Sequence, residues 1–281
     1  MVAREPIDLL HAGAEKTVGS YLLDTSEGLA LFDCGPSSCV PALEAGLRSR
    51  GVELAEIRNL LLSHIHLDHA GAAGTLAREN PGLTVWVSEV GAPHLVDPSR
   101  LERSARRLYG EHFDELWGEL APVPEANVRI VGDSVLGLDC FPTTGHASHH
   151  VSYLHEDGTL YAGDAAGVRI QPHRGVFPPT PPPDIDVEGW HRTLEEIDQR
   201  APERLALIHF GVADDVARHL AELRDRLDTW ANRVEAGATE ADFVEAARAD
   251  LPGEADAYDR AMPFWQSYAG LSRWAEKRRE G

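Results

Sequence analysis

The stretch Ser63-His64-Ile65-His66-Leu67-Asp68-His69-Ala70-Gly71 decides the fold and the chemistry that we expect of this chain. It places three imidazoles and a carboxylate within six positions, directly after the apolar run 60–62. Imidazole nitrogens and carboxylate oxygens are ligands of divalent metals such as zinc, iron and manganese. On an extended segment residues two apart point the same way, so His64 and His66 can reach one ion together. Asp68 and His69 cannot both follow them, and we therefore predict that they face a second ion.

Three later residues of metal-binding type each follow a predicted strand. The carboxyl ends of strands are where α/β sheets build their sites, so we expect these residues to converge on the histidine stretch. They are His146 in Gly145-His146, Asp164 in Gly163-Asp164 and His209 in Ile208-His209. The succession of strand, ligand loop, helix and strand around the stretch is typical of mixed α/β structure.

The motifs His-x-His-x-Asp-His, Gly-His and Gly-Asp, followed by a late His, resemble those of the metallo-β-lactamase superfamily in its hydrolase branch. The resemblance implies an α+β fold, the αββα sandwich, in which two packed sheets carry helices on their outer faces. It also implies a ligand assignment: one ion takes His64, His66 and His146, the other takes Asp68, His69 and His209, and Asp164 bridges the two. Asp33 matches an aspartate that lies just outside the ligands in that family. The helical C-terminus is similar to that of glyoxalase II-like members, where such helices border the substrate cleft.

Two ions held roughly 3.5–4 Å apart share a water and lower its pKa toward neutrality. The resulting metal-bridging hydroxide is the expected nucleophile, and Asp68 is expected to accept a hydrogen bond from it and orient it. We therefore predict a dinuclear metal-dependent hydrolase of an ester, thioester or lactone, with zinc as the expected metal and iron or manganese as alternatives. The two carboxylates and one hydroxide leave roughly one positive charge on the ions, which favours an anionic small-molecule substrate.

The motifs of this chain differ from those of several branches of the superfamily, and these differences narrow the predicted activity. β-Lactamases usually lack a histidine at the position of His69, and many use a cysteine where this chain has Asp164. Glyoxalase II and persulfide dioxygenases continue past the Gly-Asp motif with Gly-Arg-containing loops, whereas this chain has the run 165–170, Ala-Ala-Gly-Val-Arg-Ile. An iron-dependent thiol or persulfide dioxygenase and a phosphodiesterase remain as alternatives, and a non-catalytic metal-binding protein is the least favoured.

Composition and charge limit the class of partner. The formal net charge of −20 disfavours nucleic-acid binding, which relies on Lys and Arg to neutralise phosphates. No apolar run approaches the roughly 18 residues that span a bilayer, and residues 1–6 lack the layout of a signal peptide. The three cysteines, Cys34, Cys39 and Cys140, are an odd number that argues against a disulfide framework. We therefore expect a cytoplasmic protein without membrane or nucleic-acid partners, and homo-oligomers are compatible with the sequence.

The chain divides into a predicted catalytic domain, 1–212, and a C-terminal helical extension, 213–281. A helical insertion is expected at about 94–124, and six prolines make 171–184 an extended loop. Pro263 is expected to kink or split the last helix. Aromatic residues of the insertion and extension are predicted to be core rather than substrate wall: Tyr109, Phe113, Trp117, Phe264, Trp265 and Tyr268. Five histidines outside the motifs are predicted to be solvated: His94, His112, His155, His191 and His219.

Overall fold

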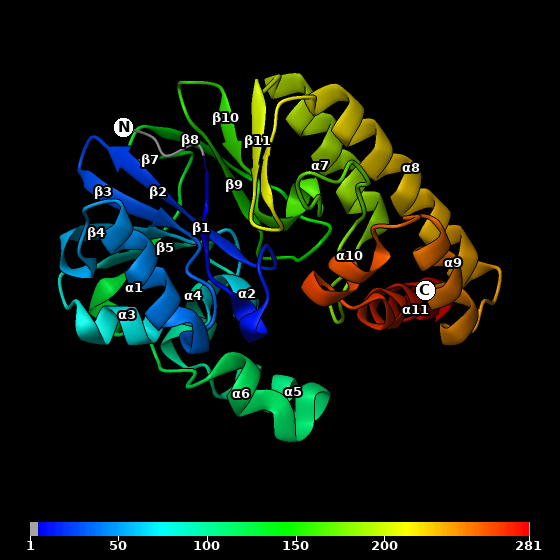
Figure 1. Cartoon of the computed structure of the whole chain (residues 1–281), viewed down its shortest axis with the longest axis horizontal. Coiled ribbons are helices and arrows are strands. Elements are labelled where there is room, and N and C mark those ends of the chain that lie inside the picture. Colours follow the sequence, from blue (N-terminus) through cyan, green and yellow to red (C-terminus); the bar gives the residue numbers. More distant parts are fainter. Residues whose placement is uncertain (1–4, 281) are drawn as a thin grey trace.

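Apolar runs in two successive parts of the chain form two six-stranded sheets in the computed structural model, which describes residues 5–280 (Figure 1). The first sheet has the order β1–β2–β3–β4–β5–β6: Ile7–Asp8, Gly19–Thr25, Gly28–Phe32, Ile57–Leu61, Thr84–Val87 and Val128–Ile130. The second sheet contains β7 to β12: Ser134–Val135, Leu138–Pro142, Val151–Leu154, Thr159–Tyr161, Arg204–Leu207 and Gly211–Ala213. Strands β3 to β6 run parallel, as do β10 and β11, and the other neighbours are antiparallel.

Aromatic side chains fill the space between the two sheets. The ring of Phe32 on β3 lies 5.8 Å from that of Tyr153 on β9 and 5.4 Å from that of Tyr161 on β10, measured between centroids. Burying one such side chain contributes roughly 2–3 kcal/mol to folding. The Tyr21 hydroxyl donates to the Leu207 carbonyl oxygen at 3.0 Å, so this buried polar group is satisfied across the sandwich. The sheets are therefore held by one continuous core.

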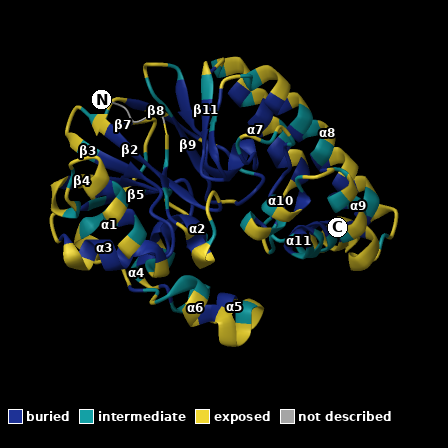
Figure 2. Cartoon of the chain, in the orientation of Figure 1, coloured by how far each residue is buried: buried dark blue, intermediate teal, exposed yellow. Residues whose placement is uncertain are grey.

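Helices cover the outer faces of both sheets, and their exposed sides face away from the strands (Figures 1 and 2). On the first sheet α1 (Val40–Ser49) buries Leu43 and Leu47, and α3 (Ala73–Glu79) lies near it. On the second sheet α7 (Val187–Arg200) buries Leu194 and Ile197. The predicted αββα sandwich is confirmed.

The insertion between β5 and β6 is helical, as predicted. It contains α4 (Ala92–Val96), α5 (Ser99–Tyr109) and α6 (Phe113–Trp117). Helices α5 and α6 project from the sandwich (Figure 1) and pack on a small apolar cluster of their own that includes Ala105, Phe113 and Leu67. Leu67 belongs to the histidine stretch, so this cluster joins the insertion to the predicted metal site.

The extension contains α8 (Val216–Glu235), α9 (Glu240–Ala249), α10 (Ala255–Ala261) and α11 (Phe264–Glu280). Pro263 separates α10 from α11, as expected. These helices share one apolar core with the second sheet, which joins Leu205 of β11 to Leu223 of α8 and Phe264 of α11. The domain boundary predicted at residue 212 falls inside β12. The extension is thus packed on the sandwich.

Two short elements lack a sequence signal. Strands β7 and β12 have only two and three residues, which is too short for an apolar pattern to develop. Among residues 5–280, no helix combines the length and apolarity that crossing a membrane requires. The expectation about a signal peptide rests largely on residues 1–4, which lie outside the described residues.

Candidate metal centre

The histidine stretch is a loop that leads into a single helical turn. Strand β4 ends at Leu61, and His66 precedes the short helix α2 (Leu67–Ala70), which carries Asp68 and His69. The backbone N–H of His69 donates to the His66 carbonyl oxygen at 3.0 Å, which closes this turn. The extended arrangement that we predicted therefore holds only as far as His66.

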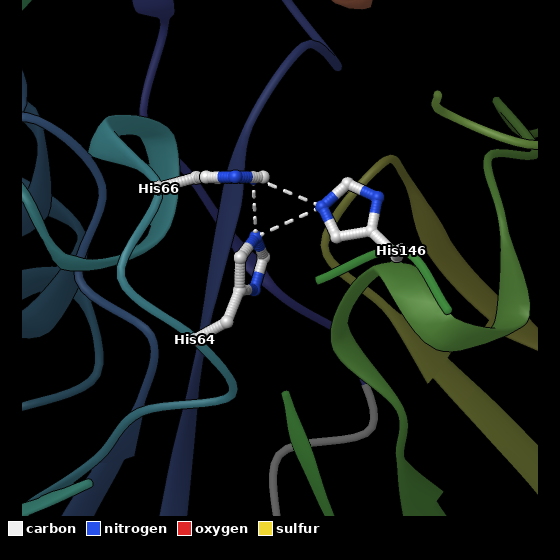
Figure 3. A group of neighbouring side chains, drawn as sticks. All are labelled: His64, His66 and His146. Carbon is white, nitrogen blue, oxygen red and sulfur yellow. Dashed lines mark hydrogen bonds between the residues drawn. The ribbon is translucent and has the colours of Figure 1, made fainter. Parts of the chain in front are cut away.

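Three imidazoles form the first group of the site. The His66 Nδ1 atom lies 2.9 Å from His64 Nε2 and 2.9 Å from His146 Nε2 (Figure 3). The His64 and His146 Nε2 atoms are 3.2 Å apart. Nitrogens bound to one tetrahedral ion at 2.0–2.1 Å lie roughly 3.3 Å apart. His146 comes from the segment after β8, so the structure brings together residues that are about 80 positions apart in sequence. The three nitrogens are close enough to hold a single ion.

A second group lies beside the first. Asp68, His69 and His209 each offer one atom, and these atoms lie within 4.8 Å of one another. The His209 Nε2 atom is 3.5 Å from Asp68 Oδ2, and His69 Nε2 is 3.8 Å from the same oxygen. His209 follows β11 in the loop that leads to β12. The seven predicted ligands are thus gathered at one edge of the two sheets.

Asp164 lies between the two groups, in the 3₁₀ turn Gly163–Ala166 that follows β10. Its Oδ1 atom is 3.4 Å from His69 Nε2 and 3.6 Å from His209 Nε2, whereas Oδ2 is 3.3 Å from His146 Nε2. One carboxylate oxygen therefore faces each group. This is the placement that a carboxylate needs in order to bridge two ions.

Four atoms of this arrangement are buried and have no hydrogen-bond partner among the described residues: His69 Nε2, His209 Nε2, and Oδ1 and Oδ2 of Asp164. An unsatisfied buried polar atom costs about 1–3 kcal/mol, and more if it is charged. A positive ion among these atoms removes that cost. The donor set of imidazoles and carboxylates therefore fits a divalent metal.

Hydrogen bonds on the far side of each ring orient the histidines. The Nδ1 atom of His146 is 2.8 Å from the Pro179 carbonyl oxygen, and that of His209 is 2.5 Å from the Thr17 carbonyl oxygen. A carbonyl only accepts, so each Nδ1 carries the proton and each Nε2 presents a lone pair to the site. Both rings are thereby set in the tautomer that binds metal.

Asp33 orients His69 in the same way. Its Oδ2 atom is 2.7 Å from His69 Nδ1, and the Ser63 hydroxyl donates to the same oxygen at 2.7 Å. The other oxygen, Oδ1, accepts the Ser63 backbone N–H at 2.8 Å. Asp33 is fully buried, so these three bonds determine its position. It supports the site without facing the candidate ions.

The charges of the site favour cation binding. Burial and neighbouring imidazoles lower the pKa of His64 and His66 well below the ordinary value, so both rings are neutral. Burial also lowers the pKa of His69 and His209, but the carboxylates of Asp164 and Asp68 outweigh it and raise the pKa above the ordinary value. A metal competes with protons for these two nitrogens, so its binding tightens as the pH rises.

His150 is a supporting residue outside the ligand set. Its Nε2 atom accepts the Asp164 backbone N–H at 3.2 Å, and its Nδ1 atom is 2.8 Å from the Thr143 hydroxyl. It therefore holds the turn that presents Asp164.

The backbone carbonyl groups of Thr17 and Pro179, which orient His209 and His146, were not predicted from the sequence. Every residue carries a carbonyl group, and no side-chain pattern marks these two.

A cavity of about 460 Å³ opens from the site and includes His66 and Asp68 in its wall. Its remaining wall comes from the insertion, the proline-rich loop and the extension. Tyr109 and Trp117 line it, so the prediction that they are core residues is wrong. Phe113 and Phe264 are fully buried, as predicted.

One prediction about the remaining histidines is corrected, and one histidine without a prediction is placed. His219, expected to be solvated, is a buried residue of α8, and its Nε2 atom lies 2.6 Å from the Ala166 carbonyl oxygen. His11, which has no companion in the sequence, stacks on Trp117 with 5.1 Å between ring centroids and lines the cavity. Both contacts are made by residues far away in sequence.

The sequence model of the metallo-beta-lactamase superfamily matches residues 16–209, which include every residue of the candidate metal centre. The chain belongs to the metallo-β-lactamase superfamily. ST1585 from Sulfolobus tokodaii, an archaeal member of known structure, matches 96% of this chain and 97% of its own length with a TM-score of 0.70 and 20% identity. That likeness shows the fold.

Two curated relatives come from Bacillus subtilis. The chain is 27% identical to the uncharacterized protein YobT over 157 residues, and the match spans 54% of this chain and 63% of YobT. It is 23% identical to YqjP, described as a probable metallo-hydrolase, over 242 residues, which are 74% of this chain and 71% of YqjP. These relatives agree with the family but do not distinguish its branches, so the glyoxalase II-like branch stays a prediction.

Proposed function

We propose that the protein is a dinuclear metal-dependent hydrolase that cleaves an ester, thioester or lactone. The observation that supports this most directly is Asp164, whose two buried oxygens face two separate groups of imidazoles without a hydrogen-bond partner among the described residues. One ion would be held by His64, His66 and His146, and the other by Asp68, His69 and His209. Two divalent ions supply an activated water and polarise the bond that is to be cleaved.

Asp68 is the proposed catalytic residue of the chain itself. Its carboxylate lies in the cavity wall, whereas the other proposed ligand carboxylate, Asp164, is 1% exposed. Burial raises the pKa of Asp68, but the imidazoles of His69 and His209 outweigh it and hold that pKa well below its ordinary value. The group is therefore ionised at neutral pH. It can accept a hydrogen bond from the attacking water and orient it toward a substrate in the cavity.

The test uses zinc-loaded protein and a panel of thioesters, esters, lactones and phosphodiesters, with metal content measured on the same samples. We expect two zinc ions per chain and hydrolysis of an acyl substrate. His66→Ala and Asp164→Ala should abolish turnover while the far-UV circular dichroism spectrum is retained. His112→Ala is the matched control, because His112 is exposed and does not line the cavity.

Two outcomes contradict the proposal. Full turnover by a folded, metal-poor His66→Ala variant would exclude the proposed role of the metal. One iron per chain together with oxygen consumption on a thiol or persulfide would instead identify a dioxygenase. Zinc as the metal and a cytoplasmic location belong to the same proposal, and metal analysis of protein purified without added metal, together with cell fractionation, tests them.

A further inference from the structure

The cavity at the metal centre has a charge opposite to that of the whole chain. The chain carries 46 acidic residues against 26 lysines and arginines. The cavity wall nevertheless contains three arginines, Arg107, Arg260 and Arg273, and a single carboxylate, Asp68. That carboxylate is a proposed metal ligand, so a bound ion would neutralise it. The other charged side chains of the wall are then all arginines.

The three arginines come from two distant parts of the chain. Arg107 lies on α5 of the insertion, whereas Arg260 and Arg273 lie on α10 and α11 of the extension. Figure 1 shows α5 at the lower edge of the molecule, α10 and α11 above it to the right, and α2 of the candidate metal centre above it to the left. The hydroxyl of Tyr109 accepts a hydrogen bond from Gln266 Nε2 at 3.3 Å, which links the two walls.

None of these three guanidinium groups has an ion pair or hydrogen bond with any of residues 5–280. Their neighbours are different: Arg106, next to Arg107, pairs with Glu102 and Asp114 at 2.9 and 2.8 Å. The three groups are exposed at the cavity and are available to a ligand.

Much of the rest of the wall is apolar. It is lined by Leu101, Leu108, Leu116, Trp117, Met262 and Pro182. A molecule that contacts both the arginines and the proposed metal centre therefore lies against an apolar wall, which favours an apolar segment between its two polar ends. Guanidinium groups bind carboxylate and phosphate oxygens through paired hydrogen bonds.

We propose that Arg107, Arg260 and Arg273 form a binding site for an acid group, and that the substrate carries a carboxylate or phosphate joined by an apolar segment to the bond that is cleaved. The inference rests on the proposed hydrolase function for the identity of that bond. The arginines determine specificity and take no part in the cleavage. The acidic remainder of the surface repels anions elsewhere, which favours this entrance over other sites.

The experiment measures binding and turnover separately. Three thioethers of equal length, with a terminal carboxylate, phosphate or hydroxyl, cannot be hydrolysed and report binding to zinc-loaded protein by calorimetry. The corresponding thioesters report kcat and KM. Variants are Arg107→Gln, Arg260→Gln, Arg273→Gln and the triple variant, and the controls are Arg103→Gln on α5 and Arg279→Gln on α11, which are exposed and outside the cavity wall.

We expect at least one of the two anionic thioethers to bind more tightly than the neutral one, and the comparison of carboxylate with phosphate identifies the preferred acid. Each single variant should weaken anion binding about three- to fivefold and the triple variant about 30-fold or more, with the neutral thioether and both controls unchanged. KM for the anionic thioester should rise in parallel while kcat changes little. The preference should shrink as salt is added, because the screening length falls from roughly 30 Å at 0.01 M to roughly 10 Å at 0.1 M.

An anion preference that survives in the triple variant would overturn the proposal, since the metal ions alone would then explain it. Equal binding of all three thioethers would overturn it as well. If the thioesters are hydrolysed without dependence on the arginines, the hydrolase function stands and the acid site fails. If they are not hydrolysed but the thioethers bind in an arginine-dependent way, the acid site stands and the hydrolase function fails.

Discussion

Replacing Asp33 by asparagine exchanges one carboxylate oxygen for an NH₂ group and should weaken the binding of one ion of the proposed pair. The aspartate accepts three hydrogen bonds: the Ser63 backbone N–H on Oδ1, and the Ser63 hydroxyl and His69 Nδ1 on Oδ2. An asparagine has only one accepting oxygen. Because the backbone N–H cannot change, that oxygen must take the Oδ1 position, and the NH₂ group then faces Ser63 and His69.

The new NH₂ group donates hydrogen bonds, as do the Ser63 hydroxyl and the protonated His69 Nδ1 atom that face it. Both of these groups must therefore reorient or move their proton. The Ser63 hydroxyl can turn its hydrogen away and accept a hydrogen bond from the NH₂ group instead. The imidazole of His69 can only move its proton from Nδ1 to Nε2. The Nε2 atom faces Asp164 at 3.4 Å, so the proton would occupy the lone pair that a metal needs. Asp33→Asn should therefore disable His69 as a ligand without touching the site directly.

The expected loss of metal affinity can be judged from the role of the Asp33 oxygen that orients His69. Removing a partner that orients a metal-binding histidine typically costs 10–100-fold in metal affinity, which is about 1.4–2.8 kcal/mol. The loss should fall on the ion held by Asp68, His69 and His209, while the His64–His66–His146 group should be affected less. The fold should also lose about 1–3 kcal/mol of stability, because a buried donor is left without an acceptor.

A zinc titration against a chromophoric chelator resolves the two binding steps. Asp33→Asn should weaken one step and leave the other nearly unchanged. Ser63→Ala is the companion variant: it leaves the Asp33–His69 contact intact and should have a smaller effect on that step. Folded Asp33→Asn protein that binds both ions with wild-type affinity would refute this account of how His69 is oriented.

Removing metal with a chelator should lower the melting temperature by about 8–15 °C in calorimetry, if zinc is supplied at roughly a thousandfold excess over its Kd. Burial lowers the pKa of His219 to about 4, so the unfolded chain binds more protons below pH 6.5 and stability falls as the pH drops from there. His219→Gln keeps a donor for the Ala166 carbonyl oxygen but does not titrate. The loss of unfolding free energy between pH 7 and pH 4, measured by denaturant titration, should therefore be about 2–4 kcal/mol smaller in this variant than in the wild type. An equal loss in the two proteins would contradict the prediction. In Gly145→Ala, with φ of +123°, the new Cβ would lie 2.4 Å from Trp190 Cα, so we expect a loss of more than about 3 kcal/mol together with weaker metal binding through His146. Gly132→Ala, whose Cβ meets nothing within 4 Å, is the control and should unfold like the wild type.

The ligand motifs and their order resemble those of the metallo-β-lactamase superfamily, and that resemblance predicted the sandwich and the seven residues that the fold gathers. This worked because each ligand is a short-range feature, a rare side chain at the end of an apolar run. Ring orientation could not be predicted in the same way. His146 and His209 are oriented by the carbonyl groups of Pro179 and Thr17, and the contact between Thr17 and His209 spans 192 positions. A carbonyl has no side-chain signature, so only the folded backbone reveals such a partner.

The aromatic residues of the helices show a second limit. Tyr109 and Phe113 lie on neighbouring helices among similar charges, yet one lines the cavity and the other is fully buried. Helical periodicity identifies an apolar face but not what that face meets. For Tyr109 the partner is Gln266, which lies 157 positions later on α11. Whether an aromatic side chain of the insertion is core or cavity wall is therefore decided by how the extension packs.

The net charge of the chain likewise does not predict which ligands a particular cavity binds. A formal charge of −20 is an average over the surface, and with screening a ligand responds mainly to groups within roughly 10 Å at 0.1 M salt. Arg107 and Arg273 are far apart in sequence and share a cavity wall only because the insertion and the extension meet. An acidic surface disfavours the binding of nucleic acid, which needs many cationic side chains in a row. It does not prevent the binding of a small anion that needs only three arginines. The chemistry expected of the site is therefore encoded locally, in residues 63–71 and the strand ends, whereas the proposed choice of substrate is encoded in contacts that exist only in the folded chain.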